Sequence, residues 1–163
     1  MKIINGDLFD NYFDAIFHQC NCFHTMGGGF AKVLSNKFPI VINADRSTPY
    51  GSHEKLGTFS KAFIMSETSF NRKIVYNLYS QFFYGRGKVQ TDYDALKKSF
   101  KNACDDLMQV FSNKLENENY NIQLAIPYLI GCGLAGGDET TVINLIDNIM
   151  DKYPRINLTA YKK

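Results

Sequence analysis

Two glycine-rich segments constrain the fold most strongly, because each lies between a strand-like and a helix-like pattern. The first, MGGGFAKVLSNKFP at 26–39, runs three glycines directly into a pattern typical of a helix. The second, IGCGLAGGDETTVINLI at 130–146, again places glycines before a helical pattern. Glycine loses more backbone freedom on folding than other residues, so such runs weaken regular structure. We therefore expect both runs to be loops that a tight turn or a bound ligand requires.

Strand-like and helix-like patterns alternate along the rest of the chain. Short apolar runs predict strands at 1–4, 13–18, 58–67, 73–79, 122–126 and 156–161. Apolar residues at helical spacing predict helices at 29–38, 92–115 and 140–152. The polar segment 40–57 is interpreted as a long irregular loop, with a helical turn as an alternative, and 70–72 as the turn between the two middle strands.

This alternation predicts an α/β fold of three layers, in which helices cover both faces of a mixed, mostly parallel sheet. The 163 residues suffice for one domain with a sizeable core, and we expect 1–163 to be a single domain. Ligands of such folds bind beyond the carboxyl ends of the strands. Three turn-like segments follow predicted strands, at 5–7, 18–29 and 127–137. We expect a binding site where these segments converge.

Composition excludes several classes of protein. No apolar run reaches the length of a membrane span, and the N-terminal MKIINGDLFD lacks the apolar stretch of a signal peptide, so we expect a cytoplasmic chain with no membrane partner. The net charge of +2 argues against an extended basic groove for nucleic acid, although it allows a local patch. Cys20 and Cys22 form C-x-C without the second pair of a zinc site. With Cys104 and Cys132 they are expected to be free thiols, and we expect no metal and no cofactor.

The glycine triplet is placed where a phosphate could bind. The N–H groups in the first turn of a helix are unpaired and carry partial positive charge, and glycine lets an anion approach without meeting a Cβ atom. A tight turn needs only one such glycine, so three favour the ligand interpretation. Residues 27–32 read GGGFAK, which is neither a Walker A loop nor the G-x-G-x-x-G of dinucleotide-binding folds.

Taken in order, three motifs resemble those of the macro domain family, which binds ADP-ribose. NGDLF at 5–9 resembles the motif that follows the family's opening strand, and HQCNCFHTMGGGFAKVLSNKFP at 18–39 resembles its first phosphate loop and helix. IPYLIGCGLAGGD at 126–138 resembles its second phosphate loop. The resemblance covers nearly the whole chain, and the most similar branch is the one of yeast and phage type that processes ADP-ribose-1''-phosphate.

The resemblance implies a role for each matching residue. Asp7 would accept a hydrogen bond from the adenine amino group, and the backbone of Leu8 would contact the adenine ring. Asn21 would face the distal ribose. The other implied ligand-binding residues would line the distal ribose and the diphosphate; they are Gly27, Gly28, Gly29, Ile130, Gly131, Cys132, Gly133, Leu134 and Ala135.

Three polar residues at these loops are the candidates for catalysis. Histidine suits general acid–base chemistry near neutral pH, and His18 ends the second predicted strand. The resemblance implies a catalytic histidine there, and the alternative is a core histidine bonded to the backbone. Asn21 would orient the ribose and water. Asp138 would orient water as well or, alternatively, cap the helix that follows it.

Another branch of the family cleaves ADP-ribosyl esters with a lysine and an aspartate. Here Ala135 stands where the aspartate would be, and Ser80 and Gln81 stand where the middle strand would supply the lysine. Lysine-adduct chemistry is therefore not expected. The aromatic residues 82–84 and Arg86 in the next loop are interpreted as a cover for the ligand or, alternatively, as ordinary loop packing.

We accordingly expect a hydrolase that acts on an ADP-ribose derivative, with ADP-ribose-1''-phosphate phosphatase as the leading activity. The glycine loops would neutralise the phosphates, which is often the largest catalytic contribution. The alternatives are removal of ADP-ribose from protein or nucleic acid, deacetylation of O-acetyl-ADP-ribose, and a non-catalytic reader or sponge of ADP-ribose. The expected partners are ADP-ribose or a derivative and, in one alternative, an ADP-ribosylated macromolecule. The chain itself is expected to be a monomer.

Overall fold

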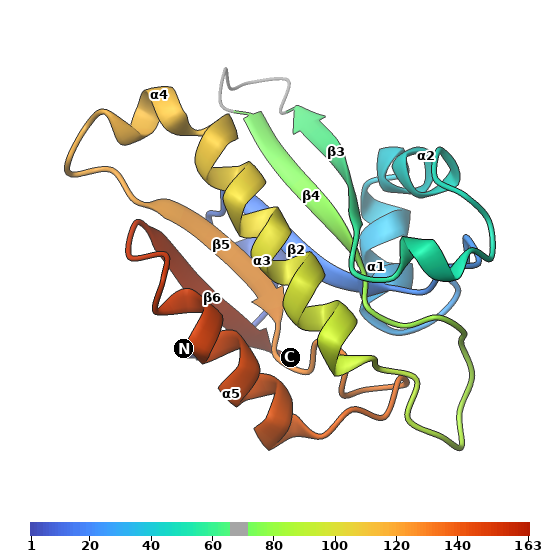
Figure 1. The fold of residues 1–163 in the computed structure, drawn as a ribbon. Helices are drawn as coiled ribbons and strands as arrows, with labels where there is room; N and C mark the ends of the chain where they lie inside the picture. The colour runs from blue at the N-terminus through green and yellow to red at the C-terminus, as the bar shows by residue number, and fades with distance from the viewer. Residues whose placement is uncertain (66–71) are drawn as a thin grey trace.

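The computed structural model describes residues 1–65 and 72–163, which form a six-stranded sheet with helices on both faces (Figure 1). The strands are β1 (Lys2–Asn5), β2 (Ala15–Cys20), β3 (Phe59–Met65), β4 (Arg72–Tyr79), β5 (Ile122–Pro127) and β6 (Ile156–Lys162). The helices are α1 (Gly29–Lys37), α2 (Ile40–Arg46), α3 (Tyr93–Val110), α4 (Ser112–Leu115) and α5 (Glu139–Met150), with short 3-10 turns at Leu8–Asp10 and His53–Lys55. This arrangement confirms the predicted α/β fold.

The sheet runs in the order β1-β6-β5-β2-β4-β3 and is parallel except for β3, which pairs antiparallel with β4. The other five strands therefore end at the same edge of the sheet. The two strands that precede the glycine-rich segments, β2 and β5, are direct neighbours, with Ala15 opposite Leu124. The segments 18–29 and 127–137 are thus brought side by side, whereas 5–7 lies farther along the same edge, after β1. The pairing of β1 with β6 joins distant parts of the chain, and the single domain over 1–163 stays a prediction.

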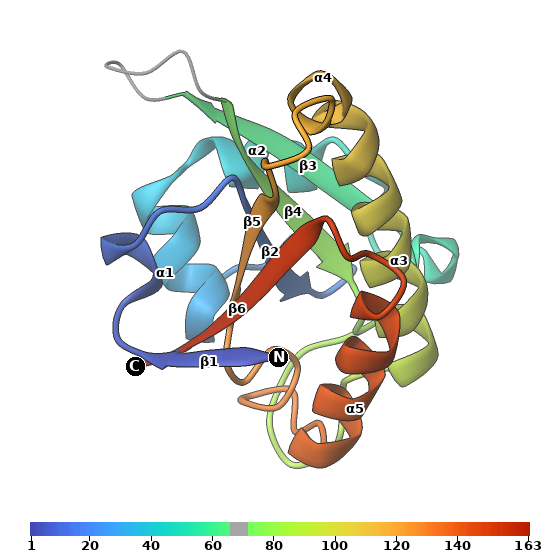
Figure 2. The same ribbon diagram turned by 90° about the vertical axis from the view of Figure 1, so that its left-hand side faces the viewer.

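Two apolar cores lie on opposite faces of the sheet and produce the three layers visible in Figure 2. On one face, α3 and α5 pack buried residues such as Leu96, Phe100 and Ile146 against the strands. On the other face, α1 and α2 contribute Leu34 and Val41. Burying one such side chain contributes roughly 1.5–3 kcal/mol, so this burial is the main force that holds both helical layers on the sheet.

The long helix of the second half of the chain is interrupted. Asp92 accepts a hydrogen bond from the N–H of Ala95 at 2.9 Å and starts α3. α3 ends at Val110 and the short α4 follows, so the single helix predicted over 92–115 is divided at Phe111. Of the helices in the described residues, none has the length and the apolar composition that crossing a membrane requires.

The interpretation of 40–57 as an irregular loop is wrong in its first half, where α2 begins directly after Pro39. The helix buries Val41 in the smaller core, but it also buries Asp45, which forms an ion pair with the equally buried Lys55. A buried aspartate breaks the apolar spacing by which a short helix is recognised, and this explains the error.

The predicted middle hairpin is only partly within the described residues. β3 is described to Met65, and Arg72 begins β4. The predicted continuation of the first strand to 67 and the rest of the turn at 70–72 lie outside the described residues.

Candidate functional site

A cleft of about 560 Å³ opens at the carboxyl edge of the sheet, beside the ends of β2, β4 and β5. The two glycine-rich segments and the loop after β4 form its walls. Its lining residues are His18, Gln19, Cys20, Asn21, Thr25, Gly27, Gly28, Gly29, Phe30, Ala31, Gln81, Tyr84, Gly85, Arg86, Pro127, Leu129, Ile130, Gly131, Gly133, Leu134 and Ala135. The structure thus brings together most of the predicted site residues. Those that are not part of the lining are Asp7, Leu8, Cys132 and Asp138.

The first glycine segment leaves the start of α1 bare. Gly28 is the N-cap residue, and no described side chain caps the helix. A Cβ atom at Gly27 would meet nothing within 4 Å, and one at Gly28 would meet only the flexible end of Leu134, at 2.8 Å. Gly29 has a φ of 55°, which residues with a side chain rarely adopt. Open space therefore adjoins unpaired helix donors, which is the geometry of an anion site.

The second glycine segment is folded back on itself. Gly131 and Gly136 have φ values of 73° and 68°. The Gly137 N–H donates to the carbonyl of Gly131 at 2.8 Å, and a Cβ atom at Gly137 would lie 2.4 Å from that oxygen. The hydroxyl of Thr91, just before α3, donates to the same carbonyl at 2.5 Å. These contacts fix the loop to the body of the protein.

Backbone donors remain free in the middle of this second segment. The N–H groups of Gly133, Leu134 and Ala135 make no hydrogen bond to any described residue. All three residues line the cleft, opposite the bare start of α1. Donors on both sides of one cleft can hold an anionic group between them, because backbone N–H groups are strong donors that require partners when water is removed.

Gln19 joins the strands at the floor of the cleft. Its Nε2 donates to Gln81 Oε1 at 2.8 Å and to Thr91 Oγ1 at 3.0 Å. Its Oε1 accepts from the Ser80 hydroxyl at 2.7 Å. Ser80 and Gln81, which stand where the ester-cleaving branch would have its lysine, are therefore engaged in this network. Sequence reasoning missed Gln19, because a glutamine within a strand pattern gives no signal of its own.

His18 lies in the wall of the cleft, but it is only 1% exposed. The amide nitrogen of Asn77 donates to the Val41 carbonyl at 3.2 Å and to Ser60 Oγ at 3.0 Å. The Asn77 Oδ1 therefore faces His18 and accepts from its Nε2 at 2.6 Å, which places the ring proton on Nε2.

The protonation of His18 follows from this environment. Burial lowers the pKa of His18 from 6.5 to about 4, and the hydrogen bond to Asn77 only partly opposes this effect. The ring is neutral at pH 7, and its one proton is engaged. This geometry is close to the alternative of a core histidine, with a side-chain amide in place of a backbone carbonyl. The catalytic role of His18 stays a prediction.

Asn21 lines the cleft and shapes the loop that precedes the glycines. Its Nδ2 donates to Oγ1 and to the carbonyl of Thr25, at 2.7 and 3.0 Å, and its Oδ1 accepts from the N–H of Phe23 at 2.8 Å. Both amide protons are used, and one lone pair of Oδ1 is left. Asn21 can thus accept one hydrogen bond from a hydroxyl group in the cleft.

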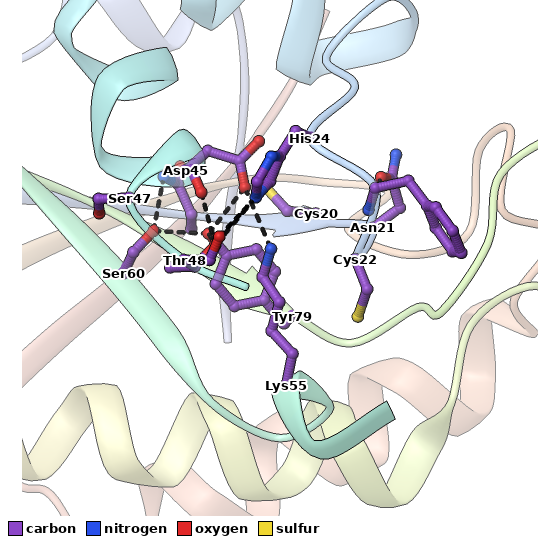
Figure 3. A network of polar contacts seen from close by, with 12 residues as sticks. Cys20, Asn21, Cys22, His24, Asp45, Ser47, Thr48, Lys55, Ser60 and Tyr79 are labelled. Carbon is purple, nitrogen blue, oxygen red and sulfur yellow. Dashed lines mark hydrogen bonds and ion pairs between the residues drawn. The ribbon is translucent and has the colours of Figure 1, made fainter. Parts of the chain in front are cut away.

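A buried polar network lies behind this loop (Figure 3). Lys55 and Asp45, 4% and 2% exposed, are paired at 3.7 Å between Nζ and Oδ1. The Tyr79 hydroxyl donates to the same carboxylate oxygen at 2.8 Å. His24, whose φ is 55°, donates from Nε2 to the carbonyl of Thr48 at 2.8 Å. The network ties α2, the end of β4 and the loop of His24 into one unit.

The predicted adenine-binding residues lie along the same sheet edge, after β1. Asp7 accepts from the N–H of Phe9 at 2.9 Å, and its second oxygen is 2.5 Å from Nζ of Lys163. The hydrogen bond from Lys163, followed by that from Phe9, lowers the pKa of Asp7. Leu8 is buried in the smaller core. Each carboxylate oxygen of Asp7 thus has one partner and one lone pair left for a ligand amino group.

Asp138 caps α5. Its Oδ2 accepts from the N–H of Thr141 at 2.8 Å and from the Thr141 hydroxyl at 2.7 Å, and these bonds lower the pKa of the carboxyl group. Its own N–H donates to the Tyr93 hydroxyl at 2.9 Å. The helix cap, which was the alternative to orienting water, is the arrangement in the structure. A part for Asp138 in catalysis stays a prediction.

The loop after β4 contributes Tyr84, Gly85 and Arg86 to the lining. Phe82 and Phe83 are not part of the lining, and the interpretation of the loop as a cover stays a prediction. Thr25 and Leu129 also line the cleft, and neither carries a sequence signal that distinguishes it from a loop residue.

The cysteines are free in the part of the chain that the structure describes. All four are free thiols, as predicted, and Cys20, Cys22 and Cys104 are buried. Within residues 1–65 and 72–163, no group of three His, Cys, Asp or Glu side chains is placed to hold a metal ion.

Comparison with known sequences relates the chain to a phage protein and to a fungal enzyme, although no family model matches it. It is 33% identical over 156 residues to the uncharacterized 17.5 kDa protein in the tk-vs intergenic region of Enterobacteria phage T4, a match that covers 94% of this chain and 89% of the phage protein. It is 37% identical over 67 residues to an ADP-ribose 1''-phosphate phosphatase of Aspergillus oryzae, a match that covers 40% of this chain and 31% of the enzyme.

Solved structures share the fold across nearly the whole chain. A protein of unknown function from Bacteroides thetaiotaomicron has a TM-score of 0.71 at 25% identity, covering 99% of this chain and 97% of the other. The macrodomain of Mycobacterium tuberculosis DarG has a TM-score of 0.67 at 20% identity, covering 98% and 95%. Thermosipho africanus DarTG, in complex with ADP-ribose, has a TM-score of 0.61 at 16% identity, covering 99% of this chain and 42% of that chain.

Proposed function

The chain belongs to the macro domain family, and from this premise we propose that its cleft binds ADP-ribose or a derivative of ADP-ribose. The observation that carries the proposal is the bare start of α1 at Gly28, beside the open space at Gly27. The free N–H groups there, and those of the second glycine segment, suit the negative charge of a diphosphate. The ADP-ribose in the Thermosipho africanus complex and the substrate in the name of the fungal phosphatase support the proposal.

In the proposed pose the ligand extends along the carboxyl edge of the sheet. Adenine meets Asp7 and the backbone of Leu8 after β1, the diphosphate lies between the two glycine segments, and the distal ribose lies near Asn21. Asn21 follows β2, three strand spacings from β1, and this corresponds to about 14 Å, a distance that extended ADP-ribose can cover.

Calorimetric titration with ADP-ribose tests this proposal. We expect saturable binding and a raised melting temperature, because a ligand that binds only the native state stabilises it by mass action. Asp7→Ala should weaken binding by roughly 1–3 kcal/mol, since it leaves the adenine amino group without its acceptor. Asp10→Ala, at an exposed carboxylate three positions later, is the matched control and should bind normally. No heat and no thermal shift at millimolar ADP-ribose would contradict the proposal.

Hydrolysis of ADP-ribose 1''-phosphate is the reaction we propose for this site. The match to the fungal phosphatase favours it. Backbone donors aimed at the phosphates would supply the electrostatic stabilisation on which such reactions depend. Phosphate release from ADP-ribose 1''-phosphate is the direct test. If His18 acts as an acid–base catalyst, His18→Ala should lower this release by about 10²–10⁴-fold.

The same assay distinguishes the alternatives. Equal turnover in the wild type and in His18→Ala would assign His18 to the core. Binding of ADP-ribose without phosphate release would indicate that the protein is a non-catalytic reader or sponge of ADP-ribose. Release of ADP-ribose from modified protein or nucleic acid, or of acetate from O-acetyl-ADP-ribose, would replace the phosphatase by the corresponding hydrolase.

A further inference from the structure

The side-chain amide of Gln19 lies where three segments meet beneath the cleft. It projects from β2 and bonds to Ser80 and Gln81, which directly follow β4, and to Thr91, which lies two positions before α3. Gln81 and Thr91 also form an isolated antiparallel bridge, and the N–H of Asp92 donates to the carbonyl of Ser80 at 2.8 Å. One side chain on β2 therefore fastens both ends of the connection between β4 and α3.

The second glycine segment is held at two points by this same connection. The Thr91 hydroxyl donates to the carbonyl of Gly131 at 2.5 Å, and the N–H of Gln90 donates to the carbonyl of Ala135 at 2.7 Å. The free N–H groups that face the cleft belong to residues 133–135, within the stretch that these two bonds hold. The position of the free donors therefore depends on the bonds made at residues 90 and 91.

The contact between Gln19 and the second glycine segment is close. A Cβ atom at Gly131 would lie 2.8 Å from Gln19 Oε1 and 3.2 Å from Thr91 Oγ1, so only glycine lets the chain approach both side chains. Ser80 and Thr91 are buried, and Thr91 is not part of the cleft lining. Buried polar groups depend on their protein partners, because water does not replace a lost bond there. A change in this network should therefore move the segment.

The direction of each hydrogen bond in the network is fixed from its two ends. The Gly131 carbonyl can only accept, so the single hydroxyl proton of Thr91 points to it, and Thr91 Oγ1 accepts from Gln19. The Phe83 carbonyl accepts from the amide nitrogen of Gln81 at 2.8 Å, so Gln81 Oε1 faces Gln19 and also accepts. Both amide protons of Gln19 are thus used. The opposite orientation of its amide would leave these acceptors without a proton.

We propose that Gln19 is a positioning residue for the diphosphate, and that it acts through Thr91 and the carbonyl of Gly131. By donating to Thr91 Oγ1, Gln19 directs the hydroxyl proton of Thr91 to Gly131, and this bond holds the free N–H groups of the second glycine segment toward the phosphates. Donors that are held in place before the ligand arrives bind it more tightly, because less ordering is required on binding. The inference rests on the proposed function and adds residues that set its affinity without touching the phosphates.

A direct contact between Gln19 and the ligand is the alternative, since Gln19 lines the cleft. Both of its amide protons are engaged, and Oε1 already accepts from Ser80, which leaves one lone pair. A phosphate oxygen has no proton to give to that lone pair, so Gln19 could take only a hydroxyl group of the ligand. The two roles predict different results when Gln19 and Thr91 are changed together.

The first test removes the Thr91 hydroxyl. Thr91→Val keeps a similar shape and should weaken ADP-ribose binding, measured by calorimetry, by roughly ten-fold. Thr91→Ser keeps the hydroxyl and should restore most of the affinity. Thr58→Val is the matched control, because the Thr58 hydroxyl also donates to a backbone carbonyl, that of Lys55 at 2.6 Å, and Thr58 does not line the cleft. This control should bind ADP-ribose normally.

A double-mutant cycle tests whether Gln19 acts through Thr91. Gln19→Leu alone should weaken ADP-ribose binding by roughly ten-fold as well. The variant with both Gln19→Leu and Thr91→Val should bind within about two-fold of either single variant, because both substitutions interrupt one chain of hydrogen bonds. Effects that multiply to about a hundred-fold would overturn the inference, since they would mean that Gln19 contacts the ligand independently of Thr91.

Amide chemical shifts separate positioning from a general loss of structure. In nitrogen-15-labelled Thr91→Val at saturating ADP-ribose, the amides of Gly28 and Gly29 should shift as in the wild type, whereas those of Gly133 and Leu134 should shift less. Equal reductions in both glycine segments would overturn the inference, and so would normal affinity in Thr91→Val, while the ADP-ribose site would stand in both cases. Failure of the wild type to bind ADP-ribose would instead contradict the proposed function, and the inference would fall with it.

Discussion

The two glycine-rich segments have similar sequences and different physical requirements. In the first, Gly27 adjoins open space and Gly28 adjoins only the end of a leucine side chain. In the second, Gly131 has a φ of 73° and a Cβ atom there would lie 2.8 Å from the Gln19 side chain, and Gly137 leaves no room before a backbone oxygen at 2.4 Å. The first segment keeps space for a ligand, whereas the second lets the chain pack on itself. Similar glycine runs beside one cleft thus differ in their steric demands, although both leave backbone N–H groups free.

The largest effect should come from the second segment. Gly137→Ala places a Cβ atom 2.4 Å from the carbonyl oxygen of Gly131, which is backbone and cannot move aside without opening the loop. We expect the free energy of unfolding to fall by about 3 kcal/mol or more, as for a strongly overpacked site. Urea unfolding measures this loss. Unchanged stability would contradict the view that the second glycine segment is tightly packed and the first is not.

The pH dependence of stability sharpens the comparison. It tests His18, a buried residue of the strand that leads into the first glycine segment. The folded protein binds a proton at His18 only below about pH 4, whereas the unfolded chain does so below pH 6.5. In that window the unfolded state binds more protons, so the free energy of unfolding decreases as the pH falls through it. We expect a loss of roughly 2–3 kcal/mol from this one group.

The matched variant for this measurement is His18→Gln, which keeps an N–H donor for Asn77 and does not titrate. Urea unfolding of both proteins at several pH values separates the contribution of His18 from that of the acidic residues. The variant should lose less stability than the wild type on acidification. Parallel pH profiles would contradict a buried, neutral His18.

A substitution in the first glycine segment should lower the affinity for ADP-ribose and leave stability unchanged, whereas one in the second should lower stability. Gly27→Val adds a branched side chain where nothing lies within 4 Å, so the free energy of unfolding should change by no more than about 0.5 kcal/mol. The same side chain would occupy the space proposed for phosphate oxygens, and the affinity for ADP-ribose should fall by about ten-fold or more. Calorimetry and thermal melting on one preparation measure both quantities. Normal affinity in a folded variant would mean that the first glycine segment serves only as a tight turn and does not contact the phosphates.

The smallest effect concerns the helix that follows the second segment. Asp138→Ala removes the cap of α5 and should lower the free energy of unfolding by about 1 kcal/mol. Asp138→Asn, which keeps an acceptor for the N–H of Thr141, should recover most of this loss. A large fall in phosphate release without a change in stability would instead support the predicted role of Asp138 in orienting water.

The strands, the two long helices and the cleft could be predicted, because they depend on local signals. Apolar periodicity identifies the elements, and the glycine runs mark the points where strands lead into helices. The fold then brings these runs together, since β2 and β5 are parallel neighbours. Eight of the predicted ligand-binding residues, at 27–29, 130–131 and 133–135, line the cleft, and each is a glycine or the direct neighbour of one.

The remaining features depend on contacts between residues that are far apart in the chain. His18 bonds to Asn77, 59 positions away, and Asp7 pairs with Lys163, 156 positions away. No pattern in the sequence indicates either partner. The same holds for Asp45, whose buried charge is compensated by Lys55 from another turn. Sequence alone could therefore identify a candidate catalyst but could not distinguish it from a buried or capping residue.

Amide chemical shifts on titration with ADP-ribose test the central claim most directly, that free backbone donors on both sides of the cleft bind a diphosphate. In the nitrogen-15-labelled protein, we expect the largest shift changes at the amides of Gly28, Gly29, Gly133 and Leu134, which move together and saturate. Changes confined to other parts of the protein, or none at saturating ligand, would contradict it.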